Sequence, residues 1–380
     1  MNPTVFSHIP DAPDWQIHWP ALVTEHHNWI EPMCHTEQDP AWHEEGDVFT
    51  HTKMACEMLV GFEAWRKLSA RDRSILFMAA FMHDIGKPYC TKREDSRIIS
   101  PKHASKGAQL ARTILWRQHG LCGDLERLKM REEITSLIRL HSLPYRFWDK
   151  PSPLWSLTHA SLHVRCNLLA LLSEADLLGR IADNRDESAA TVTMFRQYAE
   201  ENNCLDKPFP FASDHSRYAW FSGILEHTAQ TLYDDTWGES IIMSGLPASG
   251  KDTYIANRLS HLPMISLDRL RQTMRVSWHD DQSPVVNAAR EKAKEYLRKR
   301  EPFVLNATNL TVSLRQAWIK LLTSYNARVR IVYVEAPWET LLIRNRKREN
   351  PVDESAIFAM LDKLEPPTLA EAHTVDWSCG

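Results

Sequence analysis

Apolar residues recur at helical spacing through most of the first half of the chain. Six stretches follow the three-to-four-residue period of an amphipathic helix. They lie near residues 47–66, 70–83, 101–119, 124–141, 153–184 and 186–203. Gly120 and Pro144 shortly follow two of them, as residues that end helices commonly do. The pattern predicts that the first part of the chain is an all-α domain.

The pattern changes at Glu239, where short apolar runs begin to alternate with amphipathic stretches. The runs that read as strands are residues 240–245, 264–266, 303–307 and 329–334. Strands that alternate with helices form βαβ units around a parallel sheet. Residues 205–216 are rich in proline and polar residues and read as a loop. We therefore predict a multidomain chain, with an all-α domain over 1–236 and an α/β domain with a parallel sheet over 237–380.

Length and composition narrow the class of protein. A chain of 380 residues suits two domains, and it contains no run of 18 apolar residues that would predict a membrane span. The first residues lack the basic start and apolar stretch of a signal peptide. The seven cysteines include no CxxC pair, which favours reduced thiols. We expect a cytoplasmic protein without a membrane segment.

Histidines gather in the predicted helical domain, which holds 15 of the 18, over residues 1–238. The sequence FMHDIGKP (81–88) places His83 beside Asp84 at the end of an apolar helix. A His-Asp pair alone means little, because one such pair is expected by chance. Further candidate ligands lie on or beside other apolar helices, where a buried imidazole or carboxylate needs a partner. These candidates are His51, His103, His141 and Asp176.

Imidazoles and carboxylates together suit divalent transition metals such as Mn, Co, Ni, Zn or Fe. A helical bundle builds such sites by pointing these groups inward from several helices. One or two metals would activate water and neutralise the charge of a phosphate ester, and Lys87 could stabilise phosphate charge nearby. Taken one at a time, each histidine could instead be a core or surface imidazole that makes a hydrogen bond.

The order H…HD…H…H…D, with helices between its members, resembles the HD phosphohydrolase superfamily across roughly residues 40–180. The stretches WHEEGDVFTHT and HDIGKP look particularly like the HD domains appended to bacterial CCA-adding enzymes. The resemblance implies that one metal is held by His51, His83, Asp84 and Asp176. His103 and His141 match the additional ligands of the binuclear members. His43 lies close to this motif, and we assign it no ligand role.

A phosphate-binding loop opens the predicted α/β domain. GLPASGKDT (245–253) fits G-x-x-x-x-G-K directly after a predicted strand and before a helix, the context that the motif requires. Its glycines let backbone amides turn toward phosphates, and Lys251 would reach the β- and γ-phosphates. Asp252 stands where Ser or Thr normally contacts Mg²⁺, and a carboxylate can also bind this ion. The residues expected to hold Mg²⁺ and ATP or GTP are Gly245, Ser249, Gly250, Lys251, Asp252 and Thr253.

Two later segments suggest phosphoryl transfer. SLDRLRQTM (266–274) places Asp268 after the second strand, where a carboxylate could accept a proton from an attacking hydroxyl while Arg271 holds a phosphate. Alone, Asp268 would more often be a helix N-cap. RNRKREN (344–350) reads either as a solvated basic face or as a lid whose arginines neutralise the transferred phosphoryl group.

These pieces together resemble the 5′-hydroxyl polynucleotide kinase family over roughly residues 239–365, with A-T-N-L at 307–310 as a further match. The resemblance implies that Asp268 is the general base and that Arg271 contacts a phosphate of the acceptor strand. The remaining implied residues are Arg344 and Arg348 as phosphate-stabilising groups and Thr308 and Asn309 as substrate contacts. Ala307 stands where some relatives have an acidic residue. Fold-level analogy alone would also admit small-molecule kinases.

The combination resembles the bacterial HD–polynucleotide kinase fusions, a family that heals RNA ends. The resemblance implies a 2′,3′-cyclic phosphodiesterase and 3′(2′)-phosphatase joined to a 5′-hydroxyl kinase. RNA ends, DNA ends as a second possibility, an NTP and an RNA ligase would then be its partners. Two other hypotheses stay open: a nucleotide phosphohydrolase fused to a small-molecule kinase, and a sensor in which the P-loop only binds NTP.

Overall fold

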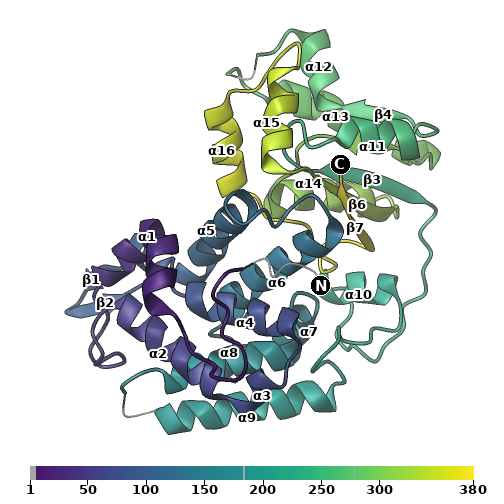
Figure 1. Cartoon of the computed structure of the whole chain (residues 1–380). Helices are drawn as coiled ribbons and strands as arrows, with labels where there is room; N and C mark the ends of the chain where they lie inside the picture. Colours follow the sequence, from purple (N-terminus) through teal and green to yellow (C-terminus); the bar gives the residue numbers. More distant parts are fainter. Residues whose placement is uncertain (1–5, 183–184, 278) are drawn as a thin grey trace. The chain divides into compact units, whose positions relative to one another are not determined.

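The computed structural model describes residues 6–182, 185–277 and 279–380, and it divides into two compact units (Figure 1). The first comprises the residues up to 121 together with 128–210, and the second comprises 122–127 together with 211–380. The first unit is helical, and the second is an α/β unit with a parallel sheet, which confirms the predicted fold class. The predicted boundary at 236/237 stays a prediction.

The first unit is built from helices and one short hairpin. Its helices are α1 (Trp19–Cys34), α2 (Val48–Gly61), α3 (Glu63–Arg66), α4 (Ala70–Met82), α5 (His103–Arg117), α6 (Leu125–Leu140), α7 (Pro153–Ser161), α8 (Cys166–Leu178) and α9 (Arg185–Glu201). The hairpin pairs β1 (Lys92–Glu94) with β2 (Arg97–Ile99) in antiparallel register. The apolar stretch predicted over 153–184 is two helices, and α1 and the hairpin were not predicted.

Helix α4 is the central helix of this unit, because every residue from Ser74 to Met82 is buried. It begins at Ser69, whose hydroxyl accepts a hydrogen bond from the Asp72 amide as an N-cap. Helices α2 and α8 pack against α4 and against each other. A helix buried on all sides carries whatever follows its end into the interior, and the residue at the end of α4 is His83.

Two glycines permit the close approach of helices that carry candidate ligands. A Cβ on Gly179, after α8, would lie 2.6 Å from the Ala55 amide nitrogen on α2. A Cβ on Gly86 would lie 2.1 Å from the carbonyl oxygen of His103 at the start of α5. Any larger residue would push these backbones apart. The glycines therefore bring α8 against α2, and α5 against the turn that follows α4.

The second unit has a five-stranded sheet in the order β4-β5-β3-β6-β7, and all its strand pairs are parallel. The strands are β3 (Glu239–Ser244), β4 (Met264–Ser266), β5 (Val304–Asn306), β6 (Arg328–Glu335) and β7 (Thr374–Cys379). The helices are α10 (Asp214–Phe221), α11 (Lys251–Arg258), α12 (Leu267–Met274), α13 (Ser283–Lys299), α14 (Val312–Thr323), α15 (Trp338–Arg346) and α16 (Glu354–Asp362). The first strand of this sheet in the chain, β3, is central. The loop that follows it therefore lies at the middle of the sheet's carboxyl edge, where parallel sheets bind ligands.

Residues 211–238, which lead from the first unit into β3, belong to the second unit. Within it, α10 begins at Ser213, whose hydroxyl accepts a hydrogen bond from the Ser216 amide. Tyr218 of α10 is part of the apolar core of this unit, and its ring stacks on His373 with 4.3 Å between centroids. The predicted loop over 205–216 thus overlaps the first turn of a helix. Of the helices in the described ranges, none combines the length and apolar character needed to cross a lipid bilayer.

Candidate active sites

The six candidate ligands of the first unit converge although they come from five helices or helix ends. They are His51 on α2, His83 and Asp84 after α4, His103 at the start of α5, His141 after α6 and Asp176 on α8. His51 Nε2 lies 3.0 Å from Asp176 Oδ1 and 3.3 Å from His83 Nε2. Asp84 Oδ2 lies 3.1 Å from His83 Nε2, and Asp84 Oδ1 lies 3.4 Å from His103 Nε2.

These side chains form two adjacent groups of three. His51, His83 and Asp176 offer donor atoms within 4.8 Å of one another, and so do Asp84, His103 and His141. Asp84 belongs to the second group but also reaches His83 of the first, so its carboxylate lies between the two. The arrangement has the donors for two ions with a shared carboxylate, as in the binuclear case expected from the sequence. The assignment of each residue as a ligand stays a prediction.

Three of these imidazoles are oriented in the same way, by donation from Nδ1 to the carbonyl oxygen three residues earlier. The pairs are His83 with Ala80 at 2.7 Å, His103 with Ser100 at 2.8 Å and His141 with Ile138 at 2.7 Å. A carbonyl oxygen only accepts, so Nδ1 carries the hydrogen and Nε2 keeps its lone pair when the ring is neutral. His83 and His141 follow helix ends, where the last carbonyls lack donors within the helix.

The protonation states also fit a metal ion. Burial lowers the pKa of His141 to about 3, which keeps this imidazole neutral. Burial alone would raise the pKa of the Asp84 carboxyl, but His83 and Lys87 hold it well below its usual range. Among the described residues, neither oxygen of this buried carboxylate has a donor in hydrogen-bond geometry. Lys87 Nζ forms an ion pair with Oδ2 at 2.7 Å. The neutral imidazole of His141 and the ionised carboxylate of Asp84 are the kinds of donor that a divalent cation requires. At His83 burial alone would lower the pKa, but the charge of Asp84 outweighs it and raises the pKa, so binding of a cation there would displace a proton.

Residues that the sequence did not single out complete this cluster. Arg180 donates to both carboxylate oxygens of Asp176, from Nε at 3.2 Å and from Nη2 at 2.6 Å. Gln38 is the second such residue, and its Oε1 accepts a hydrogen bond from Lys87 Nζ at 2.5 Å. Arg180 lies one helical turn after Asp176, which is a recognisable spacing for an ion pair. Gln38 lies in a segment without periodicity, and no signal in the sequence indicated it.

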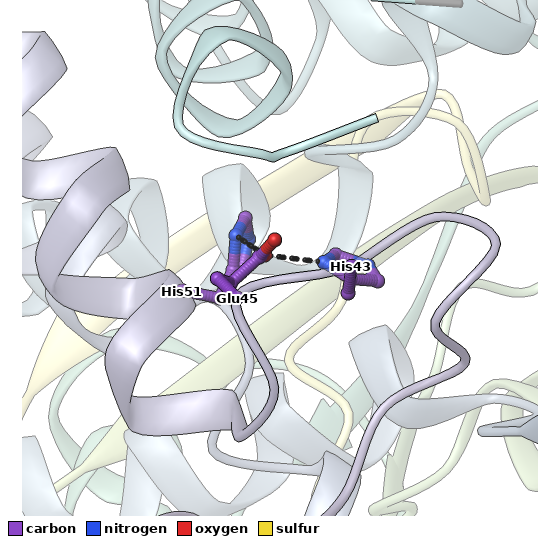
Figure 2. A group of neighbouring side chains, drawn as sticks. All are labelled: His43, Glu45 and His51. Atoms are coloured by element: carbon purple, nitrogen blue, oxygen red, sulfur yellow. Dashed lines mark hydrogen bonds and ion pairs between the residues drawn. The ribbon is translucent and has the colours of Figure 1, made fainter. Parts of the chain in front are cut away.

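Glu45 is a third residue of this kind (Figure 2). Its Oε1 lies 3.0 Å from His51 Nδ1 and 2.8 Å from His43 Nδ1. The sequence WHEEGDVFTHT contains two adjacent glutamates, and only the fold shows that Glu45 turns inward while Glu44 is exposed. His43, to which we assigned no ligand role, is therefore linked to His51 through a shared carboxylate.

A cavity of about 700 Å³ opens onto the cluster within the first unit. Asp84, His103 and His141 contribute to its wall, and so do an exposed aromatic ring, Trp42, and the phenol of Tyr145. Its lining includes the cations Lys87, Arg97, Arg146 and Arg180 and the carboxylates Asp39, Asp84 and Asp149. Each of the four cations forms an ion pair with a carboxylate of the same unit. A cavity of this size accommodates a nucleotide-sized ligand, and cations around a metal-binding cluster suit a phosphate-bearing one.

In the second unit the predicted phosphate-binding loop has the backbone that its glycines require. Gly245 has φ +144° and Gly250 has φ +106°, and a Cβ on Gly245 would lie 2.3 Å from the Val334 carbonyl oxygen. Lys251 begins α11, and its Nζ donates to the carbonyl oxygens of Gly245 at 2.9 Å and Leu246 at 2.8 Å. Burial lowers the pKa of Lys251 to about 8.

The other predicted nucleotide-binding residues surround this lysine. Ser249 Oγ is buried and lacks a hydrogen-bond partner among the residues that the structure describes. Asp252 and Thr253 are exposed in the first turn of α11. Asn306, at the end of β5, donates from Nδ2 to Asp252 Oδ1 at 2.6 Å. The sequence did not single out Asn306, because it lies far from Asp252 in the chain and belongs to no recognised motif.

Asp268 and Arg271 form an ion pair on α12 at the same edge of the sheet. The N-cap of α12 is Ser266, whose hydroxyl accepts from the Arg269 amide at 3.3 Å, so Asp268 does not serve as the cap. Arg271 Nε also donates to Gln282 Oε1 at 2.8 Å. The charge of Asp268 acts on the pKa of Lys251, which indicates that the carboxylate lies near the phosphate-binding loop.

The basic segment 344–350, which begins in the last turn of α15, lies near the same loop. Arg344 Nη1 lies 3.6 Å from the position that a Cβ on Gly250 would take. The charge of Arg348 lowers the pKa of Lys251, after the larger effect of burial. The structure thus brings both predicted lid arginines close to the loop, and their contact with a transferred phosphoryl group stays a prediction.

Thr308 and Asn309 occupy the loop after β5, beside the phosphate-binding loop. The Thr308 carbonyl oxygen accepts a hydrogen bond from the Gly245 amide at 2.9 Å. The Asn309 side chain is buried and donates from Nδ2 to the Met243 carbonyl oxygen at 2.8 Å. Both residues thereby fasten this loop to β3. Their contact with a substrate stays a prediction, and the buried amide of Asn309 is already used within the fold.

Comparison with known proteins finds a family match within each unit. Residues 48–180 match the family model of the HD domain, and residues 241–367 match a family model described as an AAA domain. The second unit also resembles solved structures. A Chloroflexus aurantiacus protein described as a kinase is 18% identical, with TM-score 0.32, over 38% of this chain and 85% of its own. A gluconokinase from Sinorhizobium meliloti 1021 is 20% identical, with TM-score 0.29, over 38% of this chain and 85% of its own.

The second unit combines its match to the AAA domain model with a parallel sheet that has β3 at its centre and a glycine-rich loop after this strand. The first unit combines its match to the HD domain model with a cluster of histidines and carboxylates that could hold a metal ion. The chain therefore carries an HD-domain region followed by an α/β region with a phosphate-binding loop.

Proposed function

We propose that this protein heals broken RNA ends with two active sites. The second unit transfers the γ-phosphate of an NTP to the 5′-hydroxyl of a polynucleotide. The first unit hydrolyses a 2′,3′-cyclic phosphate and then the remaining 3′ or 2′ phosphate. The observation that carries the proposal is the presence in one chain of a cation-lined cavity over a metal-binding cluster and of the Asp268–Arg271 pair beside a phosphate-binding loop.

For the kinase reaction, backbone amides of the glycine-rich loop and the N-terminus of α11 bind the nucleotide phosphates. Lys251 leaves the carbonyl oxygens that it contacts and pairs with the β- and γ-phosphates. Asp268 accepts the proton of the attacking hydroxyl, and the adjacent Arg271 binds a phosphate of the acceptor strand. Arg344 lies where it can neutralise charge on the transferred phosphoryl group.

Asp252 and Thr253 would hold Mg²⁺ in this unit, with Asn306 orienting the Asp252 carboxylate. Asn306 restricts the orientation of Asp252, because a carboxylate in place of the usual hydroxyl has two oxygens and more freedom to rotate. The amide of Asn306 binds Oδ1 of Asp252, which leaves Oδ2 of this carboxylate for the ion. This contact supports Asp252 as a metal-binding residue of an unusual P-loop.

For the hydrolase reaction, the six clustered residues would hold one or two divalent metals. Such ions, when bound, lower the pKa of a coordinated water and offset the charge of a phosphate ester. Lys87, Arg97 and Arg146 bind the phosphate groups of the RNA end from the cavity wall. In the first step water adds to phosphorus, one of the two ester bonds of the cyclic phosphate breaks, and the departing oxygen takes a proton. A second water then releases the remaining phosphate.

The products of both reactions are a 3′-hydroxyl and a 5′-phosphate, which are the ends that RNA ligases of the usual type join. An RNA ligase is therefore the partner that the proposed chemistry implies. The proposed role does not require a lasting complex between the two proteins, because each end can be released before ligation.

The test uses a short RNA that carries a 5′-hydroxyl and a 2′,3′-cyclic phosphate, incubated with Mg²⁺, Mn²⁺ and ATP. Both ends are followed for the wild-type protein, Asp84→Ala and Lys251→Ala. We expect Asp84→Ala to lose only 3′-end processing and Lys251→Ala to lose only 5′ phosphorylation. A DNA of the same sequence establishes the preferred strand. If wild-type protein leaves both RNA ends unchanged while consuming free nucleotides or phosphorylating a small metabolite, the proposal is wrong.

A further inference from the structure

The carboxylate of Glu45 is shared by two imidazoles in the first unit (Figure 2). Its Oε1 lies 3.0 Å from His51 Nδ1 and 2.8 Å from His43 Nδ1. Its Oε2 accepts a hydrogen bond from the Ile181 amide at 3.0 Å. The Glu45 side chain is only 1% exposed, so it is held in this position from all sides. Glu45 precedes the helix α2 that carries His51, and Ile181 follows the helix α8 that carries Asp176.

His51 needs this carboxylate because it lacks the device that orients the other candidate ligands. His83, His103 and His141 donate from Nδ1 to the carbonyl oxygen three residues earlier. For His51 that carbonyl belongs to Val48, within the first turn of α2, where it accepts the Thr52 hydroxyl at 2.9 Å. Carbonyls inside a helix are already engaged by the helix itself.

We propose that Glu45 is a positioning residue that holds His51 in the orientation and tautomer needed to bind a metal ion. His51 Nδ1 lies 3.0 Å from Glu45 Oε1, outside regular hydrogen-bond geometry, and its Nε2 lies 3.0 Å from Asp176 Oδ1 and 3.3 Å from His83 Nε2. A metal ion held by Nε2 would require the hydrogen on Nδ1, the side of the ring that faces Glu45. An ionised carboxylate at Nδ1 also makes the imidazole a more basic ligand than a carbonyl does. This inference rests on the proposed metal site of the first unit, and it does not depend on the identity of the substrate.

The second contact of Glu45 extends its effect to the cavity. His43 is buried, donates from Nδ1 to the same oxygen and contributes its ring to the cavity wall. The two rings meet edge to face, with 4.7 Å between centroids. Glu45 therefore fixes one candidate metal ligand and one residue of the wall together, and loss of its charge would release both.

The test compares Glu45→Gln with Glu44→Gln in the full-length protein. Glu44 is the adjacent residue in the same loop, has the same chemistry and is exposed, so it is a matched control. Both variants are stripped of metal and titrated with Co²⁺, and binding is followed by the visible absorption of the ion and by calorimetry. We expect Glu45→Gln to weaken Co²⁺ binding about 10- to 100-fold and to change the absorption spectrum, and Glu44→Gln to match wild type.

Two further variants separate the possible outcomes. Glu45→Asp keeps the buried charge but shortens its reach, and it is expected to weaken Co²⁺ binding in the same way if Glu45→Gln does not fold. His51→Ala tests the metal site itself. If His51→Ala loses Co²⁺ binding while folded Glu45→Gln and Glu45→Asp retain wild-type affinity and spectrum, the positioning role is wrong. If His51→Ala also binds Co²⁺ normally, the metal site assigned to this residue is wrong as well.

Discussion

Asn306 Nδ2 donates to Asp252 Oδ1 at 2.6 Å, and this bond ties the first turn of α11 to the end of β5. The two residues are neighbours only because β5 pairs with β3 in the sheet. Asp252 is the residue at which this phosphate-binding loop departs from the usual motif. The amide of Asn306 gives that carboxylate a fixed orientation, which a hydroxyl at the same position would not require.

We expect Asn306→Ala to weaken the use of Mg²⁺ by the kinase site. Without the amide, the Asp252 carboxylate can rotate, and binding of the ion would carry the entropic cost of fixing it. The Mg²⁺ concentration that gives half-maximal phosphoryl transfer should rise about three- to tenfold, since contacts that orient a metal ligand are worth up to 100-fold in affinity. Phosphate release from the 3′ end by the same preparation is the control. An unchanged Mg²⁺ dependence would contradict the role given to Asn306.

Lys251 should take up a proton when ATP binds. Burial lowers its pKa to about 8, whereas phosphates beside the ammonium favour the charged form and raise the pKa. At pH 8.5 the free lysine is mostly neutral and the bound lysine charged, so binding takes up on the order of half a proton or more. Affinity should fall as the pH rises above 8. Calorimetry in two buffers of different protonation enthalpy measures the uptake, and Lys251→Arg, which stays charged, should abolish it.

Asp268 should be required for phosphoryl transfer and not for nucleotide binding. Asp268→Asn keeps the shape of the side chain but removes the base, so the kcat of the kinase should fall about 10²- to 10⁴-fold. ATP affinity, measured by calorimetry, should change little, because the Asp268 carboxylate is exposed and pairs with Arg271. Full transfer by Asp268→Asn would show that another group accepts the proton. If the wild-type protein itself transferred no phosphate, a sensor role for the P-loop would become the better hypothesis.

Arg97 should contribute to binding of the RNA 3′ end. It lines the cavity from the β1–β2 hairpin, and its side chain is 61% exposed and contacts Asp39 at 3.4 Å. In assays of phosphate removal from the RNA end, Arg97→Ala should raise the Michaelis constant about three- to tenfold and leave kcat nearly unchanged. This pattern is expected when the lost contact binds the substrate and the transition state equally well. Lys92→Ala, on the same hairpin, is the control, because Lys92 pairs with Glu94 at 2.9 Å and does not line the cavity. Equal effects of the two substitutions would contradict a specific contact.

The parts of the fold that periodicity or a motif marked were predictable, and the rest depended on tertiary contacts. Helices α2, α4, α5 and α6 have long apolar faces, and each lies in a predicted stretch. Helix α1 was not predicted, and it carries Pro20 at its start and Pro32 inside it. Strand β7 is only partly buried at the sheet edge and carries Asp376, so it lacks the continuous apolar run that marks β3.

The candidate sites show the same division. The six clustered residues were identifiable because histidines and carboxylates on apolar helices need partners. Glu45 could not be told from Glu44, because neither lies in a periodic segment and one step along the chain reverses their exposure. Asn306 belongs to the buried strand β5, where a single amide at the end of an apolar run does not indicate a functional role. Such residues act through contacts distant in the chain, and these contacts exist only in the folded molecule.

The contact between α10 and His373 should make the stability of the second unit depend on pH. This ring stacks on Tyr218 of α10, and its Nε2 lies 3.1 Å from His215 Nδ1. Its Nδ1 accepts a hydrogen bond from the Val329 amide at 3.1 Å, which requires the unprotonated form. Burial, followed by the charge of Arg328, lowers the pKa of His373 to about 4. The unfolded chain, with a histidine pKa near 6.5, therefore binds more protons between these values. Stability should be fully present above about pH 6.5 and fall by a few kcal/mol toward pH 4. Calorimetric unfolding between pH 7 and 5 measures this dependence, and the transition of the second unit is identified by its shift on addition of ATP. The stability of His373→Gln should change less with pH than that of the wild-type protein. An equally steep change in the variant would show that other groups cause the loss of stability.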